Sequence, residues 1–257
     1  MNGFGRKGLV AAMSLVLFTA VFSAFPAFAS WNLWPSGKYR YDDASRYNAG
    51  GTSIDEMVNS LDISWVSGDV EVEYWDGSTI EVMETFSSKI SDDALLRWRV
   101  KSGRLYVKYT KTDFAIKNVD KNLIVRIPRG LVLRDVDIET VSADTTLSIQ
   151  ADALDFESVS GSLRAQMDYV KEIELETVSG EISLSLGVCP REIEGKSVSG
   201  SFSIALPEGS LYAVEFDSVS GRLRSSSANL SGGASYNPKG ASSRFEFETV
   251  SGDVSID

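Results

Sequence analysis

Residues 173–186 read IELETVSGEISLSL, and this stretch decides the fold. On either side of Val178, apolar residues alternate with glutamate or serine. Such alternation is typical of a half-buried β-strand. Its phase slips by one residue at the VSG tripeptide, which indicates a bend or bulge between two strands. The unit is therefore predicted to be a strand, a corner and a second strand.

The VSG tripeptide recurs along the chain. Its copies begin at Val66, Val141 (imperfect, VSA), Val159, Val178, Val198, Val219 and Val250. From the imperfect copy onward, successive valines lie 18, 19, 20, 21 and 31 residues apart. A period of about 20 residues indicates a repeat architecture, in which each unit is stable only against its neighbours.

Two arrangements of these units fit the sequence. One is a β-solenoid, with one coil per repeat and parallel strands stacked between coils. The other is an antiparallel meander in which Ser-Gly forms the hairpin turn. The usual hairpin turns need positive φ at the first central residue, which serine supplies poorly. We therefore predict an all-β, single-stranded β-helix or solenoid with about 20 residues per coil.

Each corner is predicted to depend on a glycine and a hydroxyl residue. Glycine is expected here because it adopts positive φ without a Cβ clash. The corner glycines are Gly68, Gly161, Gly180, Gly200, Gly221 and Gly252, and Ala143 replaces glycine in one copy. Serine or threonine precedes the valine in the six later copies, where its hydroxyl can bond the bent backbone.

The first 29 residues have the organisation of a secretory signal peptide. Two basic residues precede an apolar run, and Ala-Phe-Ala at 27–29 forms a small-x-small cleavage site. An uncleaved anchor is the alternative, because the apolar run approaches the ~20 residues that span a bilayer. We expect cleavage and an extracytoplasmic protein, secreted or associated with the cell envelope. Membrane contact is expected only if the anchor is retained.

The remaining chain is predicted to contain one domain. Residues 30–53 read as an irregular lead-in or linker, and residues 54–257 as a β-strand-repeat domain with regular repeats over 131–257.

Two long intervals between repeats carry their own predictions. Val66 and Val141 lie 75 residues apart, close to four periods, which predicts degenerate coils between them. Residues 225–243 are rich in serine and glycine and predict a loop that leaves one coil. The last strand is then expected to form an edge that must be covered.

The composition argues against several kinds of function. Histidine is absent, which removes the commonest general base and metal ligand. The formal net charge is −11. Removal of residues 1–29, which contain two basic and no acidic residues, would make it −13. Such a chain should repel nucleic acid and anionic lipid. Cys189 is the only cysteine and is expected to be a buried thiol. We expect no nucleic-acid partner, no catalytic residues and no cofactor.

Acidic residues recur at two fixed positions before the motif valine. Four residues before it, all seven copies are acidic: Asp62, Asp137, Asp155, Glu174, Glu194, Glu215 and Glu246. Two residues before it, five of seven are acidic: Glu139, Glu157, Glu176, Asp217 and Glu248. In a solenoid these side chains would stack at ~4.8 Å on one outer face, where like charges destabilise each other. We expect either screening by water and salt, or compensation by calcium, a basic partner, or interleaved lysine and arginine.

Several segments resemble a known family. LDISWVSGD at 61–69, LIVRIPRG at 123–130 and FEFETVSGDVSI at 245–256 are similar to bacterial Toastrack-type putative adhesins, β-strand-repeat proteins of unknown function. The resemblance covers roughly residues 54–257. It implies a β-helix-like fold outside the membrane and a role in adhesion or in envelope-stress sensing and signalling. It supplies no catalytic residues.

The sequence therefore predicts an exported, non-enzymatic interaction module whose partner is an envelope protein, a wall component or a second copy. A carbohydrate-active enzyme on a solenoid scaffold, such as a polysaccharide lyase or glycosidase, is the alternative. A structural spacer without a ligand is the third hypothesis. A cleft with convergent carboxylates of raised pKa would favour the enzyme, and a smooth acidic face would favour the binding module.

Overall fold

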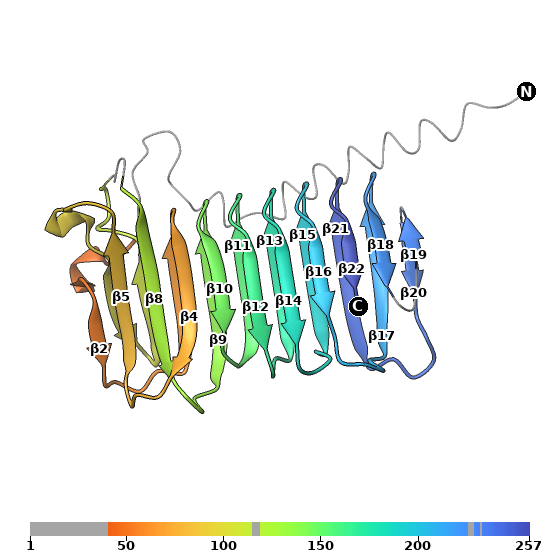
Figure 1. Cartoon of the computed structure of the whole chain (residues 1–257), viewed down its shortest axis with the longest axis horizontal. Coiled ribbons are helices and arrows are strands. Elements are labelled where there is room, and N and C mark those ends of the chain that lie inside the picture. Colours follow the sequence, from red (N-terminus) through yellow and green to blue (C-terminus); the bar gives the residue numbers. More distant parts are fainter. Residues whose placement is uncertain (1–40, 115–118, 226–228, 232) are drawn as a thin grey trace, which may run out of the picture.

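The computed structural model describes residues 41–114, 119–225, 229–231 and 233–257. The predicted signal peptide and the start of the lead-in, residues 1–40, lie outside the described residues. The described chain forms two eleven-stranded β-sheets, and Figure 1 shows them one in front of the other along the long axis of the molecule. Within these residues, no helix is both long and apolar enough to cross a membrane.

We call the two sheets sheet 1 and sheet 2. Sheet 1 has the spatial order β1 (Asn48–Ala49), β6 (Arg97–Lys101), β7 (Arg104–Lys108), β3 (Ser60–Trp65), β9 (Leu133–Thr140), β11 (Ala151–Ser158), β13 (Glu172–Thr177), β15 (Glu192–Ser197), β21 (Ser243–Thr249), β17 (Tyr212–Ser218) and β20 (Ala234–Tyr236). Sheet 2 has the order β19 (Asn229–Ser231), β18 (Arg222–Ser225), β22 (Val254–Ile256), β16 (Phe202–Ala205), β14 (Ile182–Leu186), β12 (Leu163–Met167), β10 (Asp144–Ser148), β4 (Asp69–Trp75), β8 (Lys121–Pro128), β5 (Ile80–Phe86) and β2 (Thr52–Ile54).

Each repeat gives one strand to each sheet. In sheet 1, β13 pairs in parallel with β11 and β15, and Ile173 lies level with Leu154 and Ile193. In sheet 2, β14 pairs in parallel with β12 and β16. The all-β, solenoid-like fold is confirmed, and the meander is wrong for the repeats, because neighbouring repeats run parallel. The alternating apolar residues of both sheets form one continuous buried core.

The corner glycines are required for a different reason from the one expected. Among the six, only Gly68 has positive φ, at 92°. At Gly180, a Cβ atom would overlap the carbonyl oxygen of Gly161 in the neighbouring coil, and the same overlap arises at Gly161, Gly200, Gly221 and Gly252. Close stacking of coils therefore excludes a side chain at these five corners. Ala143 is buried next to Gly68, the corner whose backbone turns differently.

The hydroxyl residues before four of the six later valines bond the backbone of their corner, as predicted: Thr177, Ser197, Ser218 and Thr249. Thr177 is fully buried, and its Oγ1 accepts a hydrogen bond of 2.8 Å from the N–H of Gly180. The Ser197 hydroxyl donates to the carbonyl of Gly200 at 2.7 Å. These bonds stabilise backbone groups that the strand ladders leave unpaired at the bend.

At the N-terminal end of the stack, the spatial order of the strands differs from their order in the sequence. The coil of β7 and β8 pairs in parallel with β3 and β4 on their outer side, so it precedes them in space although it follows them in sequence. Beyond it, β6 and β5 run antiparallel and are joined by β1 and β2. The expected series of degenerate coils is therefore one coil plus an antiparallel cap. The described part of the lead-in, residues 41–53, contains β1 and the short 3-10 helix η1 (Ala44–Arg46) and enters β2.

The last coil does not form the C-terminal edge. Strands β21 and β22 lie between the β15–β16 coil and the β17–β18 coil, as Figure 1 shows by the position of the C-terminus within the stack. The edge is formed by β17 and β18, and the antiparallel strands β20 and β19 cover it. Part of the predicted loop thus provides the cover. The expectation of a C-terminal edge was wrong because sequence order does not fix stacking order.

Candidate functional site

The outer face of sheet 1 carries the acidic columns. Parallel in-register pairing aligns Asp137 with Asp155, and Asp155 with Glu174. The column begins with Asp62, which pairs with Asp137, and continues beyond Glu174 through Glu194 and Glu246 to Glu215. The second column aligns Glu139, Glu157 and Glu176, followed by Lys196, Glu248 and Asp217. We call the two columns together the acidic ladder.

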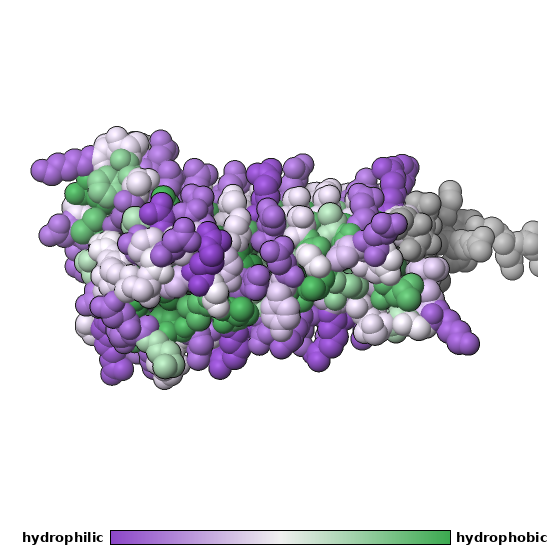
Figure 2. Space-filling view, turned by 60° about the horizontal axis from the view of Figure 1, so that its bottom comes forward, coloured by the Kyte–Doolittle hydropathy of each residue, from purple (hydrophilic) through white to green (hydrophobic). Residues whose placement is uncertain are grey.

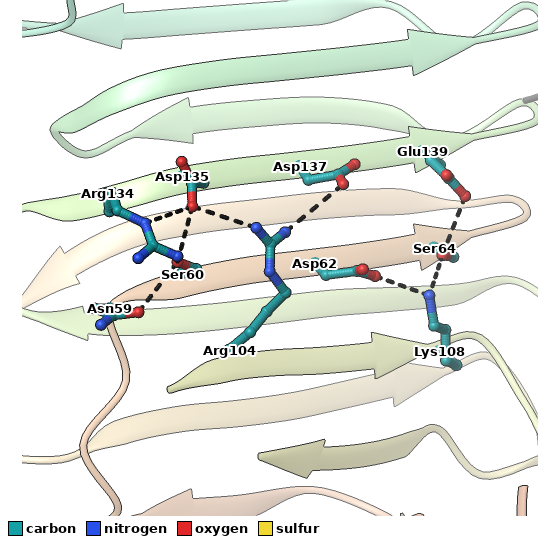
Figure 3. Close-up of polar contacts among 10 residues, drawn as sticks. All are labelled: Asn59, Ser60, Asp62, Ser64, Arg104, Lys108, Arg134, Asp135, Asp137 and Glu139. Atoms are coloured by element: carbon teal, nitrogen blue, oxygen red, sulfur yellow. Dashed lines mark hydrogen bonds and ion pairs between the residues drawn. The ribbon is translucent and has the colours of Figure 1, made fainter. Parts of the chain in front are cut away.

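The N-terminal end of the ladder is compensated by cations from β7 (Figure 3). The Lys108 ammonium lies 2.8 Å from a carboxylate oxygen of Asp62. The Arg104 guanidinium lies 3.3 Å from Asp135 and 3.8 Å from Asp137. Burial acts to raise the pKa of Asp135, but hydrogen bonds from Arg134 and Ser60, together with the charges of Arg134 and Arg104, hold it below its usual value. Interleaved cations therefore supply part of the expected compensation.

A further cation, Lys196, lies within the ladder itself. Lys196 occupies the place of a carboxylate in the second column, between Glu176 and Glu248. Its ammonium lies 3.6 Å from Glu176 and also contacts Glu194. These carboxylates raise the pKa of Lys196 against the opposing effect of burial. The ladder thus shows, on its own strand β15, how a lysine is bound between stacked acids.

At the centre of the ladder, no such cation is found among the described residues. Asp155 and Glu157 both lie on β11, and we call them the β11 carboxylates. One carboxylate oxygen of each is buried without a hydrogen-bond partner in the described part of the chain. Burial, followed by the charges of neighbouring acids, raises the pKa of Asp155 to about 6 and that of Glu157 to about 8.

Two acids beside the β11 carboxylates, Asp137 and Glu176, have pKa values shifted in the same direction. Burial and the charges of Asp62 and Asp155 raise the pKa of Asp137 to about 7. Burial raises the pKa of Glu176 to about 7 although Lys196 opposes the shift. Coordinated loss or gain of protons near neutral pH follows from this arrangement, because each carboxylate senses the charge of the next.

A shallow depression of about 320 Å³ lies beside these residues on the outer face. It extends over β9, β11, β13 and β15, with Asp137, Asp155, Glu174 and Glu194 among its lining residues. The small side chain of Ala153 on β11 also lines it. Arg104 also lines the depression and pairs there with Asp137. Among the described residues, no ion pair reaches Asp155 or Glu174, so this part of the depression can accept an ammonium or guanidinium group, which would offset the stacking of like charges.

Chemistry other than cation binding has less support in the geometry. An enzyme site was expected to combine raised carboxylate pKa values with a cleft in which the carboxylates converge, and the raised pKa values meet the first condition. However, the carboxylates stand side by side along an open sheet face and do not converge across a cleft. Among the described residues, no group of three or more acidic residues is placed to hold a metal ion, so calcium binding stays a prediction without a site.

Sequence reasoning placed twelve acids on one outer face but missed what distinguishes them. The candidate stripe facing a partner or cation was the set Asp137, Asp155, Glu174, Glu194, Glu215 and Glu246. Arg104 and Lys108 lie outside the regular repeats, so their position over the ladder could not be read from the period. Glu157 belongs to the second column and was not among the predicted site residues. Its signal in the sequence was the acidic pattern two residues before the valine. Cys189 is partly buried, and its thiol lies 3.4 Å from the Ser243 hydroxyl.

The rest of the surface gives no competing site of this kind among the described residues. Figure 2 shows hydrophilic side chains projecting in rows along both long margins of the view, with hydrophobic patches between them. Large exposed apolar residues are scattered over the described chain, for example Met57 near the N-terminal end and Leu211 before β17. Single exposed apolar residues are normal on protein surfaces.

Comparison with known proteins identifies relatives of this fold. The family model described as Toastrack DUF4097 matches residues 53–257. A putative cell adhesion protein from Clostridium sporogenes is structurally similar at 10% identity, with a TM-score of 0.51, covering 82% of this chain and 98% of that chain. No significant match was found among curated protein sequences.

Two further solved structures share less of the geometry. A putative adhesin from Bacteroides fragilis matches at 11% identity and a TM-score of 0.37, covering 82% of this chain and 97% of that one. A putative lipid binding protein from Parabacteroides distasonis matches at 14% identity and a TM-score of 0.32, covering 84% and 96%. At these identities the similarity concerns the fold alone.

Proposed function

The chain belongs to the Toastrack DUF4097 family, and from this premise we propose that it is an exported, non-enzymatic interaction module of the cell envelope. We propose further that its acidic ladder binds a basic surface of an envelope protein or an amino-bearing wall component. Export is supported by the predicted signal peptide, and mass spectrometry of the mature protein should find Ser30 at its N-terminus.

The uncompensated β11 carboxylates are the observation that carries the binding proposal. Two stacked columns of acids are stabilised by Arg104 and Lys108 at one end and by Lys196 further along. The buried oxygens of Asp155 and Glu157 between them have no partner in the described structure. A lysine of a partner placed over β11 would repeat the arrangement that Lys196 makes on β15. Electrostatic recognition of this kind also gives specificity against acidic surfaces.

The test measures binding of defined peptides to the purified mature chain at pH 8 by calorimetry. A lysine-rich peptide should bind, a glutamate-rich peptide of equal length should not, and binding should weaken with salt. The paired substitution Asp155→Asn with Glu157→Gln should weaken binding of the lysine-rich peptide. The paired substitution Glu181→Gln with Glu208→Gln removes two exposed charges outside the acidic ladder and is the matched control. Equal loss in both variants would show that only overall charge matters and would contradict the proposal.

The enzyme remains a second candidate because the β11 carboxylates have the raised pKa values that acid–base catalysis uses. Incubation of the chain with acidic and neutral polysaccharides, followed by a reducing-end assay, distinguishes the two. Hydrolysis that Glu157→Gln abolishes would favour the enzyme. Binding without turnover would favour the interaction module.

A further inference from the structure

The C-terminal coil, residues 243–257, fills a slot whose two walls precede it in the sequence. Strand β21 pairs with β15 on one side and β17 on the other, and β22 pairs with β16 and β18. The walls are connected to each other by residues 206–211, which bridge the width of one coil (Figure 1). Both walls of the slot are therefore made before the coil that fills it is reached along the chain.

The slot is shaped for one particular side chain. Gly195 on β15 breaks a column that has leucine at Leu175 and phenylalanine at Phe247. A Cβ atom at Gly195 would lie 2.5 Å from the Phe247 ring. The Phe247 ring is fully buried, and its centroid lies 5.5 Å from that of Phe202. The missing side chain of one strand thus provides the space for the ring of the inserted strand.

The coil is also bonded along both edges. The Val250 N–H donates to the Ser197 carbonyl at 3.2 Å, and the Val250 carbonyl accepts from the Ser220 N–H at 3.0 Å. The Thr249 hydroxyl lies 3.0 Å from that of Ser218. Removal of the coil would leave strand edges open on both walls, and open edges attract further strands. Matching residues at the corner, the hydroxyl column and the Phe247 position favour this coil over an unrelated strand.

We propose that the slot also accepts the C-terminal coil of a second copy of this chain, so that copies link by exchanging residues 243–257. Every contact that the coil makes with β15 to β18 can form between two copies, because both surfaces are identical in each. The exchanged and unexchanged arrangements differ in whether residues 243–257 pack against their own chain or against another copy. Exchange therefore preserves the bonding and costs mainly the entropy of association, which protein concentration offsets.

The test uses single-cysteine variants in a Cys189→Ser background. Residues 194 and 246 lie directly opposite each other on β15 and β21. A full-length Glu194→Cys protein is mixed with an isotope-labelled Glu246→Cys protein, incubated below the melting temperature and then oxidised. Mass spectrometry should detect a disulfide between labelled and unlabelled chains, and its yield should rise with protein concentration.

Two controls make the result decisive. Residues 174 and 194 face each other on β13 and β15, outside the last coil, so a mixture of Glu174→Cys and Glu194→Cys proteins measures collisional cross-linking. We expect several-fold more mixed disulfide from the 194–246 mixture, and equal yields would overturn the proposal. One chain carrying both Glu194→Cys and Glu246→Cys should close an internal disulfide. Its failure to do so in a folded monomer would refute the register on which the exchange depends.

Discussion

Neutralising Glu157 should stabilise the protein at alkaline pH. Burial and neighbouring acids raise its pKa from 4.5 to about 8. At about 1.4 kcal/mol per pKa unit, this corresponds to about 5 kcal/mol of destabilisation once the side chain is ionised. Glu157 is partly exposed and shares its repulsion with other acids, so we expect Glu157→Gln to recover less than half of this loss, and to raise the free energy of unfolding by ~2 kcal/mol.

The sign of the effect fixes the pH window. The folded-state pKa of Glu157 is higher than the unfolded value, so the folded state holds the proton more tightly. The destabilisation is absent below the unfolded pKa, grows as pH rises from 4.5 and is complete above about 8. The variant should therefore gain stability at pH 8 and little at pH 4.5.

Thermal and urea unfolding at these two pH values measure the difference. For a domain of this size, ~2 kcal/mol corresponds to about 4–8 °C in Tm. Glu215→Gln serves as the matched control, because Glu215 is exposed, and its unfolding free energy should change by less than ~0.5 kcal/mol. A Glu157→Gln protein that is no more stable at pH 8, or equally stabilised at both pH values, would refute the reasoning.

Three further substitutions test the packing. Gly180→Ala should destabilise the protein by about 2–3 kcal/mol in urea unfolding, because its Cβ would overlap a carbonyl of the neighbouring coil. Lys121→Met should cost about 3–5 kcal/mol, because it leaves the buried Glu84 carboxylate, 2.9 Å from the ammonium, without its charge partner. Gly195→Ala should lower the Tm through a clash with Phe247. Adding Phe247→Leu should restore part of this loss, as measured by a double-mutant cycle.

The controls for these substitutions lie at exposed sites. Ser183→Ala makes a small change on the exposed outer face of β14 and should leave the unfolding free energy within ~0.5 kcal/mol of that of the parent chain. Lys111→Met removes an exposed ion pair to Asp93 and should cost less than ~1 kcal/mol. A loss at Lys111 as large as that at Lys121 would contradict the role assigned to burial.

The acidic ladder shows how far sequence reasoning reaches toward a site. The period of the repeat is enough to align Asp155 with Glu174, because parallel repeats stack equivalent positions. It could not show that Arg104 reaches across from β7 or that Lys196 compensates its neighbours. Nor could it show that the β11 carboxylates have no cation beside them in the described part of the chain. These differences arise from contacts between coils that no local pattern records.

The sequence by itself determined the repeat, the alternating strands, the buried hydroxyl column and the all-β solenoid-like class. These follow from periods of two and about twenty residues, which act locally and repeat in every unit. Only the tertiary structure decided the order of stacking: the β7–β8 coil lies outside β3 and β4, and the coil of 243–257 lies between two earlier coils. It also decided why the corners need glycine, since Gly180 meets a neighbouring carbonyl and not a strained φ. The physical reason is the same in each case. Coils of similar sequence present similar edges, so the repeat pattern fixes how neighbouring coils pair. Individual contacts, such as the packing of Phe247 against Gly195, fix which coil lies next to which.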